Sequence, residues 1–382
     1  RGFGRFAGEA VTAETALPAG GLVEVLLAVG VLRELATRDV ALETDLRKLF
    51  PDAELPFEGL SLHALLSHTS GLPSLAALAP DVAPPDRDAL VEWLRSSVLE
   101  SEPGSCFAWS TTDTLLAWAW LRRASEVDFD QYAAKHLFEP LGLASATFAE
   151  GSGLRFVDGV ADLGRGEPFH YELLDLPGAA RLRLSAPDVL AWHHALEDRA
   201  LLDEASSRAL LGDTRLADGS LTGHGYGVHR TRLDDFEGYC YGGGLGAGAV
   251  RVASYPELGL SIAVLAAGPL DSLAGLERAI SRAVFDLPSP EPLDLPLEES
   301  QRARYAGVYQ IGCDRLVVAD EEGRLALALA DETHPLRYQG GNEFASAVDA
   351  GLRLRFVLNS AGEVVAFVLD DHGAEAIARR FG

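Results

Sequence analysis

Apolar residues recur along the chain with two different periods, and the dominant period changes near residue 296. Residues 22–38 are strongly apolar and predict a buried core helix. Residues 60–66 repeat the helical spacing behind Ser61, a residue that caps helices well. Residues 88–97 and 113–125 predict two further helices, the second of them long and apolar.

Strand-type patterns dominate the second half of the chain. Residues 250–255 and 260–266 predict a hairpin, because Pro256–Gly259 between them supplies turn residues. The proline-rich stretch Pro288–Pro292 predicts a domain boundary at about residue 296. We therefore expect domains at residues 1–296 and 297–382. The second should be a small antiparallel barrel or sheet, because short strands follow one another at regular spacing: 307–309, 315–319, 324–329, 352–358 and 363–369.

Charge narrows the classes of partner. The 382 residues contain 48% hydrophobic and 23% charged residues, as in ordinary globular proteins, and carry a formal net charge of −25. So acidic a surface repels nucleic-acid phosphates and anionic lipid, and it favours cationic ligands. No apolar run is long enough for a transmembrane helix. We expect neither nucleic-acid nor membrane partners.

The three cysteines, Cys106, Cys240 and Cys313, are too few for a disulfide framework, so we expect buried free thiols. Unpaired thiols favour a cytoplasmic location. No histidine or cysteine spacing fits a metal site, and no cofactor is expected. Because methionine is absent altogether, we also expect that the N-terminal part of the first domain is missing from the sequence.

Several motifs resemble the serine β-lactamase and penicillin-binding-protein superfamily, in particular its class C, esterase and D-peptidase branch. The most specific is His68–Pro73, which reads HTSGLP; Phe138–Leu143 (FEPLGL) and Thr15–Gly20 also match family segments. The resemblance covers roughly residues 10–270 and, more weakly, 297–382. It implies an α+β fold: an antiparallel sheet flanked by helices, an all-helical lobe, and a C-terminal lipocalin-like β-barrel.

The resemblance also places the family's catalytic Ser-x-x-Lys on this chain, and neither residue is there. Gly21 occupies the serine position and Glu24 the lysine position. In the family the serine attacks an acyl carbonyl and the lysine helps remove its proton. Glycine has no side chain to attack with. The only lysines, Lys48 and Lys135, fall in segments that the family places away from its cleft.

The second family motif, Tyr-x-Asn, aligns with Trp109-Ser110-Thr111. Tryptophan cannot replace tyrosine in acid–base work, because its indole N–H only donates. The third motif, Lys-Thr-Gly or His-x-Gly, aligns with Tyr241-Gly242-Gly243, followed by Gly244. Tyr241 keeps a hydroxyl, and the glycines would allow close backbone approach of an extended ligand. All three motifs are thus degenerate.

The resemblance therefore favours a catalytically inactive member that binds a peptide or peptide-like ligand in the former cleft. The candidate ligand-binding residues are Gly21, Glu24, Trp109, Ser110, Thr111, Tyr241, Gly242, Gly243 and Gly244. Such a protein could present a substrate to other enzymes of a peptide natural-product pathway, an analogy rather than a deduction.

Two other interpretations stay open. A rearranged hydrolase would use Glu24 and Tyr241 for acid–base work on water. A purely structural subunit would have a cleft collapsed around Trp109. Ser70, beside a histidine, and Cys106 are weaker candidate nucleophiles, because the family uses the Ser70 segment structurally and a reactive thiol needs a base.

Overall fold

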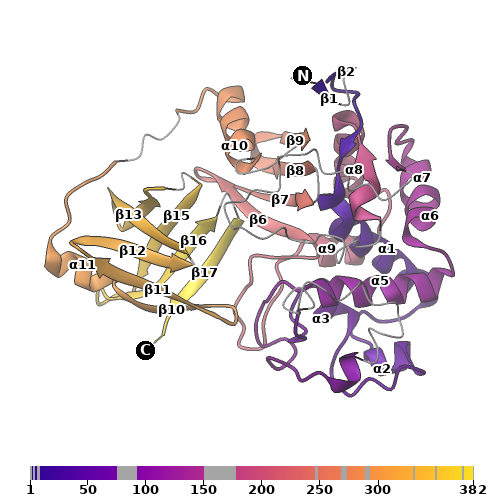
Figure 1. Ribbon diagram of the computed structural model, residues 1–382, viewed down its shortest axis with the longest axis horizontal. Helices are drawn as coiled ribbons and strands as arrows, with labels where there is room; N and C mark the ends of the chain where they lie inside the picture. Colours follow the sequence, from indigo (N-terminus) through magenta and orange to yellow (C-terminus); the bar gives the residue numbers. More distant parts are fainter. Residues whose placement is uncertain are drawn as a thin grey trace.

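The computed structural model describes residues 2, 5–6, 9–74, 93–149, 178–245, 248–267, 273–288, 293–329, 332–348, 351–371 and 374–381. Within them the chain forms a mixed α/β N-terminal domain and a C-terminal β-barrel that lie side by side (Figure 1). The four-stranded sheet of the N-terminal domain stands between the barrel and most of the helices (Figure 1).

Helices make up one part of the N-terminal domain. The longest, α1, runs from Val23 to Arg38 and has a mostly buried surface, as its sequence predicts. It packs against α5 at Gly30, where a Cβ would lie 2.9 Å from Leu121 Cδ2, so a larger residue would have to displace that side chain. The helical segments of this domain are η1 (Gly20–Leu22), α1 (Val23–Arg38), α2 (Leu46–Leu49), α3 (Leu62–Leu66), α5 (Thr111–Ser125), α6 (Phe129–Ala133), η3 (Ala134–Phe138), α7 (Glu139–Leu141), η5 (Ala179–Arg181), α8 (Ala186–Glu197), α9 (Glu204–Leu211), η6 (Pro256–Leu258) and α10 (Leu273–Val284).

The predicted helix over 60–66 is confirmed as α3, and the Ser61 side chain caps it by accepting a hydrogen bond from the Ala64 amide. The helix predicted over 113–125 is confirmed as α5, which begins two residues earlier. Half of the helix predicted over 88–97 lies outside the described residues; within the described half, residues 93–96 are helical.

The main sheet is antiparallel with strand order β6-β7-β8-β9. The predicted hairpin is confirmed: β8 and β9 pair from Tyr255↔Leu260 to Gly248↔Ala267 around η6. The strands of this domain are β1 (Arg5–Phe6), β2 (Glu9–Ala10), β3 (Leu17–Pro18), β4 (Thr147–Phe148), β5 (Leu182–Leu184), β6 (Val228–Leu233), β7 (Phe236–Leu245), β8 (Gly248–Tyr255) and β9 (Leu260–Ala267).

The barrel is closed, with all eight strands antiparallel in chain order. Its interior is aromatic: Tyr309, Phe344, Phe356 and Phe367 are buried and pack edge to face. The sequence missed β13, β14 and β17, because Pro335 interrupts the first, the second is short and the third ends in two arginines. The elements are α11 (Glu299–Tyr305), β10 (Gly307–Ile311), β11 (Asp314–Glu321), β12 (Arg324–Leu329), β13 (Glu332–Gly340), β14 (Glu343–Ser346), β15 (Leu352–Leu358), β16 (Val364–Asp371) and β17 (Ala374–Arg380). The predicted boundary at residue 296 lies between α10 and α11.

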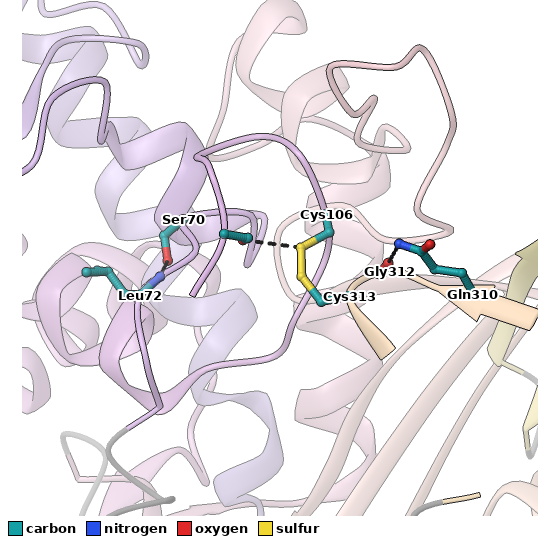
Figure 2. The surroundings of a disulfide bond; sticks show 7 residues. Ser70, Leu72, Cys106, Gln310, Gly312 and Cys313 are labelled. Carbon is teal, nitrogen blue, oxygen red and sulfur yellow. Dashed lines mark hydrogen bonds between the residues drawn. A yellow bond between two sulfur atoms is a disulfide. The ribbon is translucent and has the colours of Figure 1, made fainter. Parts of the chain in front are cut away.

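A disulfide joins the two domains and corrects the expectation of three free thiols. Cys106 and Cys313 are bonded across 207 residues of sequence, with their Cα atoms 5.5 Å apart, and Cys240 is free and buried. Figure 2 shows this bond between a loop of the N-terminal domain and the turn that joins β10 to β11. The sequence could not reveal the pair, because its two cysteines meet only when the barrel docks. The argument for the cytoplasm loses its premise with this bond.

Candidate functional site

Backbone fills the space beside Gly21, the residue that the family resemblance aligns with the nucleophile. Gly21 lies in η1, directly before α1, and faces β7 at Gly243. A Cβ built on Gly21 would stand 2.3 Å from the Gly243 carbonyl oxygen and 2.4 Å from its nitrogen. Real Cβ atoms do not approach backbone so closely, so a serine side chain does not fit unless η1 or β7 moves. Position 21 therefore has no side-chain hydroxyl in the sequence and no room for one in the structure.

Glu24, one turn further along, has an indole as its partner. Its Oε1 accepts a hydrogen bond from Trp109 Nε1 at 2.8 Å. The Trp109 residue is 48% exposed, and the Glu24 side chain is 24% exposed, so the pair lies at the surface. Trp109 is thus neither core packing nor an acid–base group, and no arginine partner of Glu24 occurs among the described residues. Two degenerate positions bond directly to each other.

His68 and Asp113 form a buried pair behind Glu24 that the sequence analysis did not single out. His68 Nδ1 lies 3.4 Å from Asp113 Oδ2, and His68 Nε2 lies 3.9 Å from Glu24 Oε1. Asp113 Oδ1 accepts a 2.5 Å hydrogen bond from the Ser70 hydroxyl. One signal could have revealed Asp113. It is a carboxylate on the same helix face as the apolar Ala117, four residues later, and a charged residue on an apolar face needs a partner.

His68 and Asp113 both have raised pKa values, so each holds its proton more tightly than usual. Burial acts to lower the pKa of His68, but the hydrogen bond to Asp113 and the charges of Glu24 and Asp113 outweigh it, so the pKa is raised. Burial raises the pKa of Asp113 above its usual value, against the opposing effect of His68 and Ser70. The two shifts agree, because two carboxylates face a single imidazole in a closed environment.

Ser110 and Thr111 are buried rather than displayed in an open groove. The Ser110 amide donates to His68 Nδ1 at 3.3 Å, while its hydroxyl has no hydrogen-bond partner among the residues described. Thr111 Oγ1 lies 3.3 Å from Ser74 Oγ. Both side chains are therefore enclosed by the protein.

Tyr241 is enclosed in the core. Its hydroxyl lies 3.1 Å from His193 Nδ1, and the other ring nitrogen of His193 lies 3.1 Å from Ser261 Oγ. Only 1% of Tyr241 is exposed, and burial raises its pKa well above the usual value for a phenol. The structure therefore separates Tyr241 from the surface on which Trp109 lies.

The glycine run behaves differently. Gly243 and Gly244 are exposed, whereas Gly242 is half-buried and has a φ of +106°, which favours glycine. The ladder from β6 ends at Val228↔Tyr241, but the ladder to β8 continues to Leu245↔Gly248. Residues 242–245 thus have a strand on one side only, within the described part of the sheet.

A small pocket adjoins Glu24 on its inner side, with room for about one water molecule. It is too small for a ligand. Its lining is mostly apolar and includes Glu24, His68 and Tyr226 together with Leu27, Leu65 and Leu66.

The two weaker candidate nucleophiles are both engaged. Cys106 is bonded to Cys313, so it is not a free thiol. The Ser70 hydroxyl donates to Asp113 and accepts from the Leu72 amide at 3.0 Å, which gives it a structural role. Among the described residues no cluster of histidine, cysteine and carboxylate side chains could hold a metal ion. No helix in the described ranges is long and apolar enough to cross a bilayer.

Comparisons with known proteins agree with this architecture. The family model described as Beta-lactamase matches residues 1–286. The solved structure of SurE with D-Leu is 23% identical with a TM-score of 0.57, covering 98% of this chain and 90% of SurE. The octameric penicillin-binding protein homologue from Pyrococcus abyssi is 18% identical with a TM-score of 0.62, covering 98% and 90%.

A D-amino acid amidase from Ochrobactrum anthropi SV3, complexed with L-phenylalanine, is 18% identical with a TM-score of 0.55, covering 74% of this chain and 89% of the amidase. At these identities the solved structures establish the fold alone. Among curated protein sequences, none matches the chain.

Proposed function

Because the chain belongs to the β-lactamase family, we propose that it is a non-catalytic member that binds a peptide or peptide-like ligand at the surface formed by Trp109, Glu24, Gly243 and Gly244. The observation that carries the proposal is the contact between Gly21 and Gly243. It leaves neither a nucleophile nor space for one where the family forms its acyl-enzyme.

The binding half of the proposal is supported by what remains exposed. Trp109 offers a large, rigid aromatic surface of the kind that dominates recognition sites. Beyond Gly243, which packs against Gly21, residues 244–245 have no partner in β6, and an extended peptide could add there as a strand. Glu24 and the net charge of −25 favour a ligand with a cationic group.

The ligand class is drawn from the structural neighbours. SurE is described in complex with D-Leu, and the Ochrobactrum protein is a D-amino acid amidase. A peptide containing a D-amino acid is therefore the first ligand to test, and presentation of such a peptide to other pathway enzymes is a consistent role. The rearranged hydrolase has less support, because Tyr241 is enclosed in the core and bonded to His193.

A thermal-shift and calorimetric screen tests the proposal with D-leucine, D-leucinamide and short peptides ending in a D-residue. We expect a ligand that raises Tm in the wild type but not in Trp109→Ala. Phe381→Ala is the matched control, since Phe381 is 47% exposed and lies in the barrel. Turnover of nitrocefin or p-nitrophenyl acetate above background, or labelling by a fluorophosphonate, would contradict the non-catalytic half.

A further inference from the structure

The loop that precedes Trp109 is held from two sides. On its own domain, the Gly104 amide donates to the Thr69 carbonyl at 2.7 Å and the Ala108 amide donates to the His68 carbonyl at 2.9 Å. On the other side, Cys106 is bonded to Cys313 of the barrel. The disulfide thus anchors the barrel three residues before the side chain that bonds to Glu24.

The contact around the disulfide is close and continuous. Gly312, next to Cys313, touches the loop so tightly that a Cβ there would lie 2.3 Å from the Phe107 carbonyl oxygen. The Phe107 ring stacks on His224 at 4.1 Å between centroids and meets His68 edge-on at 6.2 Å. His68 in turn lies 5.9 Å from the Trp109 ring. An unbroken series of contacts therefore runs from the β10–β11 turn to Trp109.

The two bridged cysteine residues differ in exposure. Cys106 is buried at 7% exposure, whereas Cys313 is exposed on the barrel turn. An incoming thiolate can therefore reach the Cys313 sulfur, and Cys106 becomes the leaving group. The mixed disulfide would therefore form between the incoming thiol and Cys313.

We propose that the Cys106–Cys313 bond is a thiol–disulfide exchange site, reactive toward a dithiol, that sets the position of the Trp109 loop. A thiolate of the dithiol attacks Cys313 Sγ, the Cys106–Cys313 bond breaks, and Cys106 leaves as a thiolate that takes up a proton. The second thiol of the reagent then attacks its own mixed disulfide and releases Cys313 as a thiol. The protein gains two electrons and two protons, and the dithiol is oxidised to a disulfide.

Reduction breaks the covalent link between the barrel turn and the loop, while the hydrogen bonds of the loop to His68, Thr69 and Ala217 remain. The Trp109 surface then loses preorganisation, and ligand affinity falls. This last consequence rests on the proposed function; the release of the loop does not.

Hydrogen exchange without any ligand tests whether the disulfide holds the Trp109 loop. We expect the amides of Ala108 and Ser110, both bonded to His68, to exchange at least several-fold faster after treatment with dithiothreitol. In Cys313→Ser they should exchange fast with or without the reagent. Alkylation with mass mapping should show that Cys106 and Cys313 react only after reduction. Equal protection before and after verified reduction would overturn the proposal, as would free thiols at both positions in protein purified without reductant.

Affinity provides the second arm. D-leucinamide should bind the oxidised protein several-fold more tightly than the reduced protein, and dithiothreitol should change nothing in Cys313→Ser. Suppose that exchange at Ala108 and Ser110 responds to reduction but D-leucinamide and the other screened compounds do not bind. The role of the disulfide in holding the loop is then supported, and the proposed function fails. If ligands bind but hydrogen exchange does not respond to reduction, only the proposed role of the disulfide fails.

Discussion

Gly21 and Gly243 lie in backbone contact: the Cβ that a serine would bring to position 21 stands 2.3 Å from the Gly243 carbonyl oxygen. Glycine on both sides permits this approach of η1 to β7. The family resemblance assigns the attacking hydroxyl to position 21, so we expect that restoring one motif does not restore the chemistry.

The double substitution Gly21→Ser with Glu24→Lys should therefore give no hydrolysis of nitrocefin or p-nitrophenyl acetate. We also expect Gly21→Ser alone to lower the free energy of unfolding by about 1–3 kcal/mol, because the side chain must displace backbone. Urea unfolding measures the loss, and Ala205→Ser on the exposed side of α9 is the control. Esterase activity in the double variant would show that the rest of the site is intact.

Tyr241→Phe separates the binding interpretation from the rearranged hydrolase. Removing the hydroxyl leaves His193 Nδ1 without the partner that it has in the wild type, so stability should fall by about 1–3 kcal/mol. Ligand affinity should not change, because Tyr241 is buried away from Trp109. Calorimetry of ligand binding by the variant checks this. A large loss of affinity with unchanged stability would place Tyr241 in the site after all.

Stability should fall as the pH rises above about 6.5, the ordinary value for histidine. The folded-state pKa of His68 is raised, so the stabilisation from its proton is complete below the unfolded pKa and is lost as the pH rises through the folded pKa. Asp113, whose pKa is also raised, acts in the same direction above its ordinary value. Buried His229 acts oppositely in acid, because burial lowers its pKa to about 3.

Urea unfolding between about pH 6 and about pH 9 measures this dependence. His68→Asn should flatten the curve, and asparagine tolerates the φ of +52° at this position. His136→Asn, in η3, is the control for the loss of an imidazole outside this network. A slope that persists in His68→Asn would assign the effect to other groups.

Replacing both cysteines of the bridge, Cys106→Ser with Cys313→Ser, should destabilise the oxidised protein. Cross-linking residues 207 apart removes loop entropy from the unfolded chain that corresponds to about 5 kcal/mol as an upper value. Differential scanning calorimetry should show a lower Tm for the double variant and no further fall with dithiothreitol. An unchanged Tm would mean that the docked barrel does not depend on the bond.

The sequence alone predicted the elements whose signals are local. Helix α1 follows from a long apolar run, the β8–β9 hairpin from a proline–glycine turn, and the barrel from strands at regular spacing. The alignment of Gly21 and Glu24 with the family's serine and lysine stays a prediction, because a motif match compares only residue types over short spacings. These features need no knowledge of what lies opposite.

Only the tertiary structure decided how the degenerate positions are used. Glu24 with Trp109, His68 with Asp113, and Cys106 with Cys313 are pairs separated by many residues, and no periodicity encodes such pairs. Tyr241 appeared available in the sequence, yet strand β7 directs it into the core. Contacts of this kind arise when helices, sheet and barrel pack, since burial and proximity are properties of the assembled chain rather than of its segments.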